Sequence, residues 1–177
     1  MAHTLLLSGR PGVGKTTVIK AIAKQLDERA DGFYTEEIRA HGQRQGFLLR
    51  ELRGEQATLA HVQLKGGGRP SVGRYGVETA ALDRVGVVAM QRGLAQDRVI
   101  IVDEIGKMEL FSQAFKVALL AVLDAQVPLI ATVMARPHPW VDSLKARSDV
   151  TLWQVTLENR NVLPSRVLGW LHSPSVC

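Results

Sequence analysis

The chain has 177 residues, 46% of them hydrophobic and 22% charged, which fits one globular domain over residues 1–177 and excludes a disordered protein. Its 22 Lys and Arg against 17 Asp and Glu give a net charge of +5. That charge suits phosphate-bearing ligands and permits contact with nucleic acid, without proving either.

The sequence shows no membrane span and no cysteine framework. The apolar stretch 115–135 is interrupted by Lys116, Asp124 and Pro128, so it predicts a helix, a turn and a buried strand. The single cysteine, Cys177, cannot form a disulfide within one chain, which fits a reducing compartment. We therefore expect a soluble cytoplasmic protein, monomeric and not attached to a membrane.

A short buried strand over residues 4–7 and an amphipathic helix over 15–29 enclose the phosphate-loop motif G-x-x-x-x-G-K-[ST]. The glycines permit positive φ angles and let backbone N–H groups approach phosphate oxygens. Lys15 is expected to reach the β- and γ-phosphates, and Thr16 to offer Mg²⁺ a hydroxyl oxygen. The predicted nucleotide-binding residues are Gly9, Arg10, Pro11, Gly12, Val13, Gly14, Lys15, Thr16 and Thr17.

Residues 33–39 and 47–52 flank a polar turn and predict a β-hairpin inserted into the fold, with a third strand over 58–64 and a helix over 77–94. Glu36 on this hairpin is a candidate for contact with the attacking water or a Mg²⁺-bound water, with local structure as the alternative. The many arginines here could form a nucleic-acid patch. A solvated face is favoured, because no RNA-binding aromatic motif accompanies them.

A continuous β-branched run at 99–102 predicts a strand covered on both faces, and it ends in Asp103 and Glu104. Asp103 is expected on the Mg²⁺ side of the site, where it can orient a metal-bound water. Glu104 is expected to accept a proton from the attacking water. The alternative is an acidic pair that caps the following helix.

The rest of the chain predicts a helix around 111–122, a strand at 128–134, a short helix at 141–146, a strand at 150–155 and a closing helix at 158–171. Alternating strands and helices indicate an α/β fold with a mostly parallel sheet. Thr132 could sense the γ-phosphate, although a buried threonine bonded to backbone is slightly preferred. Arg136, and Arg160 in the first turn of the last helix, are candidate arginine fingers.

Five runs follow one another along the chain: residues 9–17, 31–37 (D-G-F-Y-T-E-E), 73–77 (G-R-Y-G-V), 102–110 (V-D-E-I-G-K-M-E-L) and 158–161. Together they resemble the cancer-related nucleoside-triphosphatase family, the small THEP-type P-loop NTPases. The resemblance implies a RecA-like or ASCE-type fold and slow, Mg²⁺-dependent hydrolysis of ATP, GTP, CTP and UTP to diphosphates. It carries over residues 9–16 as the phosphate site, with Asp103 beside the metal and Glu104 activating water.

Two other functions remain open at this point. The same fold could serve a nucleotide or small-molecule kinase, which would turn over faster with one specific acceptor than with water. A nucleic-acid-associated ATPase would be stimulated by RNA or DNA, and that stimulation would fall with rising salt.

Overall fold

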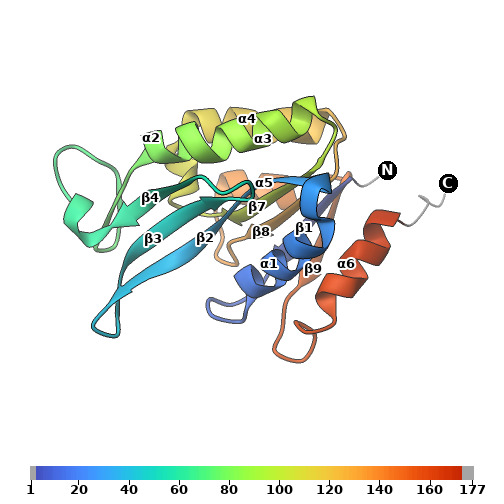
Figure 1. Cartoon of the computed structure of the whole chain (residues 1–177), viewed down its shortest axis with the longest axis horizontal. Helices are drawn as coiled ribbons and strands as arrows, with labels where there is room; N and C mark the ends of the chain where they lie inside the picture. Colours follow the sequence, from blue (N-terminus) through green and yellow to red (C-terminus); the bar gives the residue numbers. More distant parts are fainter. Residues whose placement is uncertain (1–2, 173–177) are drawn as a thin grey trace.

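The computed structural model describes residues 3–172, which form a nine-stranded sheet flanked by helices (Figure 1). Cys177, on which the expected reducing compartment rests, lies outside them. The strands are β1 (Thr4–Ser8), β2 (Ala30–Ala40), β3 (Gln43–Glu51), β4 (Gln56–His61), β5 (Ser71–Val72), β6 (Tyr75–Val77), β7 (Val99–Ile105), β8 (Leu129–Val133) and β9 (Val150–Gln154). The α-helices are α1 (Lys15–Leu26), α2 (Thr79–Ala81), α3 (Val88–Ala95), α4 (Gln113–Asp124), α5 (Pro139–Lys145) and α6 (Leu163–His172).

The strand order is β5-β6-β4-β3-β2-β7-β8-β1-β9. Strands β2, β7, β8, β1 and β9 pair with their neighbours in parallel. On the other side of β2, strands β3, β4, β6 and β5 form antiparallel pairs. Helices α3 and α4 cover one face of the sheet, while α1 and α6 cover the other (Figure 1). This confirms the expected P-loop fold, a mostly parallel α/β sheet with an antiparallel hairpin.

The hairpin is continuous with the central sheet, because β2 belongs to both halves. Its first residues, 30–33, pair in parallel with β7, and the remainder pairs antiparallel with β3. The strand predicted at 33–39 therefore starts too late. Asp31 and Gly32 are residue types that strands disfavour, which hid its beginning. At Gly32 the backbone has a φ of 121°, and a Cβ would lie 2.0 Å from the Ile101 carbonyl oxygen.

The helix predicted over 77–94 is wrong at its start and interrupted in the middle. Residues 75–77 form β6, and the helix contains a π-helical stretch, Leu82–Val87, between α2 and α3. Gly86 lies in this stretch, where a Cβ would come 2.9 Å from the Phe33 ring. The strand predicted at 58–64 is also shifted, since it ends at His61, whose side chain accepts a hydrogen bond from the Gln63 backbone N–H.

The last helix begins five residues later than predicted. The backbone N–H of Thr156 donates to Asn159 Oδ1 at 2.8 Å, and the Asn159 N–H donates back to Thr156 Oγ1 at 3.3 Å. The Asn159 amide also donates to the Gln154 carbonyl. These local bonds hold residues 156–162 as turns, because side-chain hydrogen bonds of this kind compete with helix formation.

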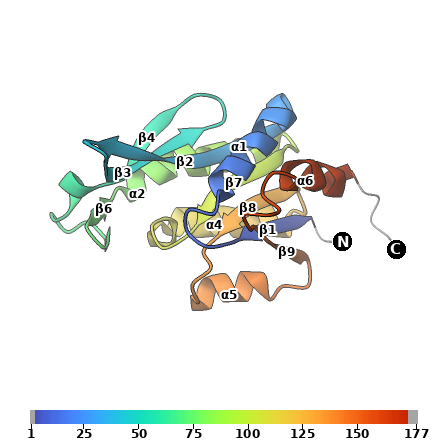
Figure 2. The ribbon, with the colours of Figure 1, turned by 90° about the horizontal axis from the view of Figure 1, so that it is seen from below.

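The parallel strands end at a common edge of the sheet. The loops that follow β1, β7, β8 and β9 therefore gather there, beside the start of α1 (Figure 2). In parallel α/β sheets this carboxyl edge is where ligands bind. Within residues 3–172, no helix combines the length and apolar character needed to cross a membrane.

Candidate active site

The loop between β1 and α1 has the backbone that its glycines predict. Gly12 and Gly14 have φ angles of 77° and 107°, in the left-handed region that side chains disfavour. Gly9 is needed for a different reason, since a Cβ there would lie 2.8 Å from the Val155 carbonyl oxygen. The first turn of α1 has no side-chain cap and no acidic residue. Its free N–H groups and positive dipole end are therefore available to an anion.

The Lys15 ammonium lies across the loop. It donates to the Gly9 carbonyl at 2.9 Å and lies 3.4 Å from Glu104 Oε2. Its side chain is 10% exposed. A lysine held between the loop and an acidic strand end is well placed to meet the negative charge of phosphate oxygens.

Asp103 is almost fully buried, at 1% exposure. Its two carboxylate oxygens accept hydrogen bonds from hydroxyls, Oδ2 from Thr16 at 2.7 Å and Oδ1 from Thr132 at 2.5 Å. Burial raises the pKa of Asp103 above its usual value, although the hydrogen bonds from Thr132, Thr16 and the Thr35 backbone act against that rise. The buried carboxylate is thus hydrogen-bonded but forms no ion pair with the residues described.

Glu104 follows Asp103 through a cis peptide bond and is more accessible, with 33% of its side chain exposed. Burial raises its pKa, Lys15 lowers it, and the negative charge of Asp103 raises it further. A carboxylate with a raised pKa beside a phosphate site is a better proton acceptor than a fully solvated one.

Glu109 is a neighbour of the site; it belongs to the run 102–110, but its sequence position predicts no role for it. It is buried and accepts a hydrogen bond from the Gly106 backbone N–H at 3.1 Å. Burial, with the nearby charges of Glu104 and Asp103, raises the pKa of Glu109 to about 8. Its position in a short 3-10 turn after β7, rather than in a strand or long helix, left no periodic signal to find.

Among the weaker candidates, Thr132 lies in the centre of the site. Its hydroxyl donates to the Asp103 side chain. The slightly preferred interpretation, a buried threonine bonded to backbone, was therefore wrong about the hydrogen-bond partner. Glu36 is occupied by ion pairs, with Lys20 at 2.5 Å and with Arg50. The hydrogen bond from Lys20 is the largest influence on Glu36 and lowers its pKa. No hydrogen bond joins Glu36 to Lys15, Thr16, Asp103 or Glu104 in the described part of the chain.

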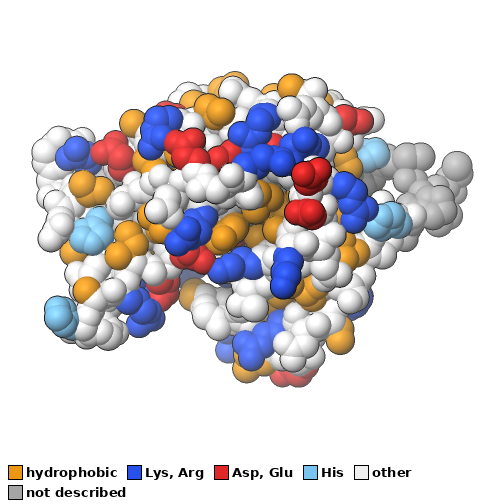
Figure 3. Space-filling view, viewed as in Figure 1, with side chains coloured by type: hydrophobic (Ala, Val, Ile, Leu, Met, Phe, Trp, Pro, Cys, Tyr) orange, Lys and Arg blue, Asp and Glu red, His pale blue; other side chains and the backbone are white. Residues whose placement is uncertain are grey.

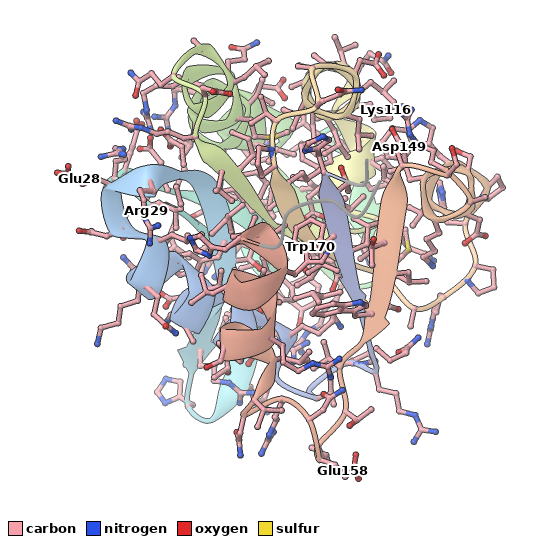
Figure 4. The ribbon with its side chains drawn as sticks, turned by 90° about the vertical axis from the view of Figure 1, so that its right-hand side faces the viewer. Glu28, Arg29, Lys116, Asp149, Glu158 and Trp170 are labelled. Atoms are coloured by element: carbon pink, nitrogen blue, oxygen red, sulfur yellow. The ribbon has the colours of Figure 1, made fainter. Side chains whose placement is uncertain are left out.

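The two candidate arginines differ in position. Arg160 lies in the turns before α6, not in the first turn of a helix as predicted, and its guanidinium donates to the Val13 carbonyl at 3.2 Å. A Cβ on Gly14 would lie 3.3 Å from Arg160 Cδ, so this side chain rests on the phosphate loop. Figure 4 shows Glu158 at the tip of the loop between β9 and α6, which also contains Arg160, and Trp170 on α6. Arg136 is exposed in the loop after β8 and forms no ion pair with residues 3–172.

The arginines of the hairpin are mostly paired with carboxylates. Glu37 bonds Arg39 and Arg44, and Glu36 bonds Arg50. Figure 3 shows Lys and Arg side chains interleaved with Asp and Glu on this face. The hairpin therefore carries much less free positive charge than its arginine count suggests.

The oxygen atoms around Asp103 fit a divalent cation. A buried carboxylate without a cationic partner is costly, and Mg²⁺ prefers hard oxygen ligands such as the Thr16 hydroxyl. Across residues 3–172, no group of three or more His, Cys, Asp or Glu residues could hold a metal alone.

Comparisons with known proteins identify relatives along almost the whole chain. The sequence model of the family described as NTPase matches residues 4–168. The nucleoside-triphosphatase THEP1 of Thermotoga sp. strain RQ2 is 40% identical over 167 residues, covering 94% of each chain. The crystal structure of THEP1 from Aquifex aeolicus is similar with a TM-score of 0.86 at 33% identity, covering 96% of this chain and 99% of that one. The solution structure of a human cancer-related nucleoside triphosphatase gives a TM-score of 0.81, also at 33% identity, covering 98% and 99%.

Proposed function

The chain belongs to the NTPase family, and from that premise we propose that it hydrolyses nucleoside triphosphates by attack of water on the γ-phosphate, with Mg²⁺ as cofactor. The observation that carries the assignment is the convergence of four groups at one edge of the sheet. Lys15 and Thr16 come from the phosphate loop and α1, whereas Asp103 and Glu104 come from the end of β7.

Binding and charge stabilisation fall to the phosphate loop. Its backbone N–H groups and the Lys15 ammonium hold the phosphate oxygens and stabilise the charge that develops on them. Thr16 and Asp103 would hold Mg²⁺, which neutralises negative charge on the β- and γ-phosphates when bound. Because the Thr16 hydroxyl donates to Asp103, its lone pairs are left free for the metal.

Water activation falls to Glu104. Its raised pKa and partial exposure suit a group that takes a proton from the attacking water. Because the Lys15 ammonium lies 3.4 Å from Glu104 Oε2, we propose that Lys15 meets the phosphates next to the base. Arg160, whose guanidinium donates to the Val13 carbonyl of the phosphate loop, is proposed to contact the nucleotide.

The substrate range is proposed to include ATP, GTP, CTP and UTP, since the groups named above contact phosphates and not bases. We propose a monomer, because one chain supplies all four groups. We also propose that it acts in the cytoplasm, where these substrates are found. The names of the relatives favour water as acceptor over the kinase alternative.

Phosphate release from the four triphosphates with Mg²⁺, compared among wild type, Glu104→Gln and Lys15→Ala, tests the proposal. Glu104→Gln should lower the rate by about 10²- to 10⁴-fold while nucleotide binding is retained. Lys15→Ala should lower both the rate of phosphate release and the affinity for nucleotide. The matched control is Glu28→Gln, which changes an exposed glutamate in the 3-10 turn after α1 (Figure 4) and should release phosphate normally. Unchanged release by Glu104→Gln would show that Glu104 is not the base.

A further inference from the structure

A groove of about 610 Å³ opens beside the candidate active site, between segments that are far apart in the sequence. The β5–β6 turn forms one side, residues 107–111 and the first turn of α4 form the second, and residues 138–140 at the start of α5 form the third. Its volume falls within the roughly 300–1,000 Å³ of small-molecule sites. The groove is therefore large enough for a ligand the size of a nucleotide.

The groove is positively charged. Lys107 and Lys116 both line it, and neither forms an ion pair with any residue that the structure describes; Lys116 is labelled on α4 in Figure 4. No Asp or Glu is among the lining residues. A third ammonium lies at the rim, where Lys65 donates to the Gly73 carbonyl at 3.0 Å. Low-dielectric walls strengthen the field of such uncompensated cations, so the groove favours an anion.

Aromatic side chains lie in the same groove. Phe111 is 46% exposed, and Trp140 is half-buried against the core cluster beneath it. His138 completes this side of the groove, and its Nδ1 is buried without a hydrogen-bond partner in residues 3–172. Aromatic faces beside cationic side chains are the combination that binds nucleotides, because bases stack on rings while phosphates meet the cations.

We infer that this groove binds a second nucleotide unit, separate from the triphosphate on the phosphate loop. The base stacks on Trp140 and Phe111, and the phosphate meets Lys107 and Lys116. The inference goes beyond hydrolysis and involves no covalent step. A free nucleoside monophosphate and the end of a single nucleic-acid strand share this chemistry, and experiment separates the two sources.

The position of the groove brings the second ligand close to the reaction. Two residues separate Glu104 from Lys107, and the second of them, Gly106, donates its backbone N–H to the Glu109 side chain. One short segment thus contributes to both sites. For that reason the test must keep the phosphate loop filled, so that occupation of the groove is measured by itself.

Equilibrium dialysis of labelled AMP measures this directly, using the whole chain with Mg²⁺ and a saturating non-hydrolysable ATP analogue. We expect about one AMP bound per chain. Its affinity should fall at least about 10-fold in Lys107→Ala/Lys116→Ala, in Trp140→Leu and in Phe111→Ala. Phe111→Ala is included because Trp140 also packs on the core. The matched control is Lys24→Ala/Arg29→Ala, which removes two exposed cations elsewhere and should bind AMP normally.

A second arm replaces AMP with a short 5′-phosphorylated single-stranded RNA. Binding of the RNA alone, weakened by the same groove variants, would support the site and identify a strand end as its ligand. The inference is overturned if neither probe binds once the phosphate loop is saturated, or if both bind the groove variants as tightly as wild type. Phosphate release from ATP, measured for the same variants in the absence of the analogue, reports separately on the proposed hydrolysis.

Discussion

Two buried aspartates on neighbouring strands have opposite surroundings. Asp31 on β2 is fully buried and accepts two hydrogen bonds from Arg92, at 2.8 Å and 2.5 Å. The Nη1 atom of Arg98 lies 3.5 Å from its Oδ2. Asp103 on β7 is equally buried, yet its partners are the hydroxyls of Thr16 and Thr132. One carboxylate is neutralised by ion pairs within the fold, whereas the other has no ion-pair partner among the described residues, although the nearby charge of Lys15 lowers its pKa.

The difference separates a structural role from a functional one. An arginine pair of this kind, once formed, cannot readily be broken, because either partner alone would be a buried unpaired charge. Asp103 instead accepts hydrogen bonds from Thr132 and from Thr16, a proposed metal ligand, and its burial raises its pKa. A buried acid that lacks a cationic partner is thus a stronger indication of a ligand site than burial alone.

The largest expected effect on stability comes from Asp31→Asn. The substitution leaves Arg92 near Glu51 but removes its bidentate partner, and we expect the free energy of unfolding to fall by about 3–5 kcal/mol. Urea unfolding followed by circular dichroism measures it. Asp149→Asn, which breaks an exposed pair with Arg147, should cost no more than about 1 kcal/mol. Equal losses in the two variants would contradict the comparison.

Asp103→Asn should show the reverse pattern. Turnover should fall at least about 100-fold, equivalent to roughly 2.7 kcal/mol in the barrier, because the metal side of the site loses its charge. The free energy of unfolding should stay within about 1 kcal/mol of wild type or rise, since an unbalanced buried charge has been removed. Phosphate release and urea unfolding, measured on the same variant, test both expectations. If Asp103→Asn were as unstable as Asp31→Asn, the distinction between a functional and a structural aspartate would be refuted.

Thr132→Val refines the description of Asp103. It removes one hydroxyl donor at nearly constant volume, and we expect the free energy of unfolding to fall by about 1–2 kcal/mol. In the Asp103→Asn background the loss should shrink, because the acceptor is no longer charged. A double-mutant cycle measures that coupling, and purely additive effects would argue against the bond.

The smallest expected change in the free energy of unfolding, counted per pH unit, comes from Glu109. Its native pKa of about 8 lies above the unfolded value, so the native state retains a proton that the unfolded chain releases above about pH 4.5. Stability should therefore fall between about pH 4.5 and 8, by up to about 1.4 kcal/mol per unit from this group. Glu109→Gln is neutral at every pH and should lack this slope. Urea titrations at pH 6, 7 and 8 compare the two, and parallel slopes would exclude a proton on Glu109.

The sequence predicted the elements whose residue types carry a local signal. The β-branched run before Asp103 and the glycines at 12 and 14 indicated the strand and the loop directly. What it could not show were bonds across the sheet, such as that of Thr132 to Asp103, because strand order is not encoded locally. Arg160 was misplaced for a related reason, since the hydrogen bonds of Asn159 compete with helix formation.

For protein engineering, the double membership of β2 limits what can be exchanged. Residues 30–33 are shared with the central sheet, and the Thr35 backbone bonds Asp103, so the hairpin is not a detachable module. A graft has to begin beyond residue 35. The exposed turn at His41 and Gly42, where both φ angles are positive, is the better place to insert a label or a reporter peptide. Such an insertion would lengthen the tip while leaving every strand pairing next to β7 in place.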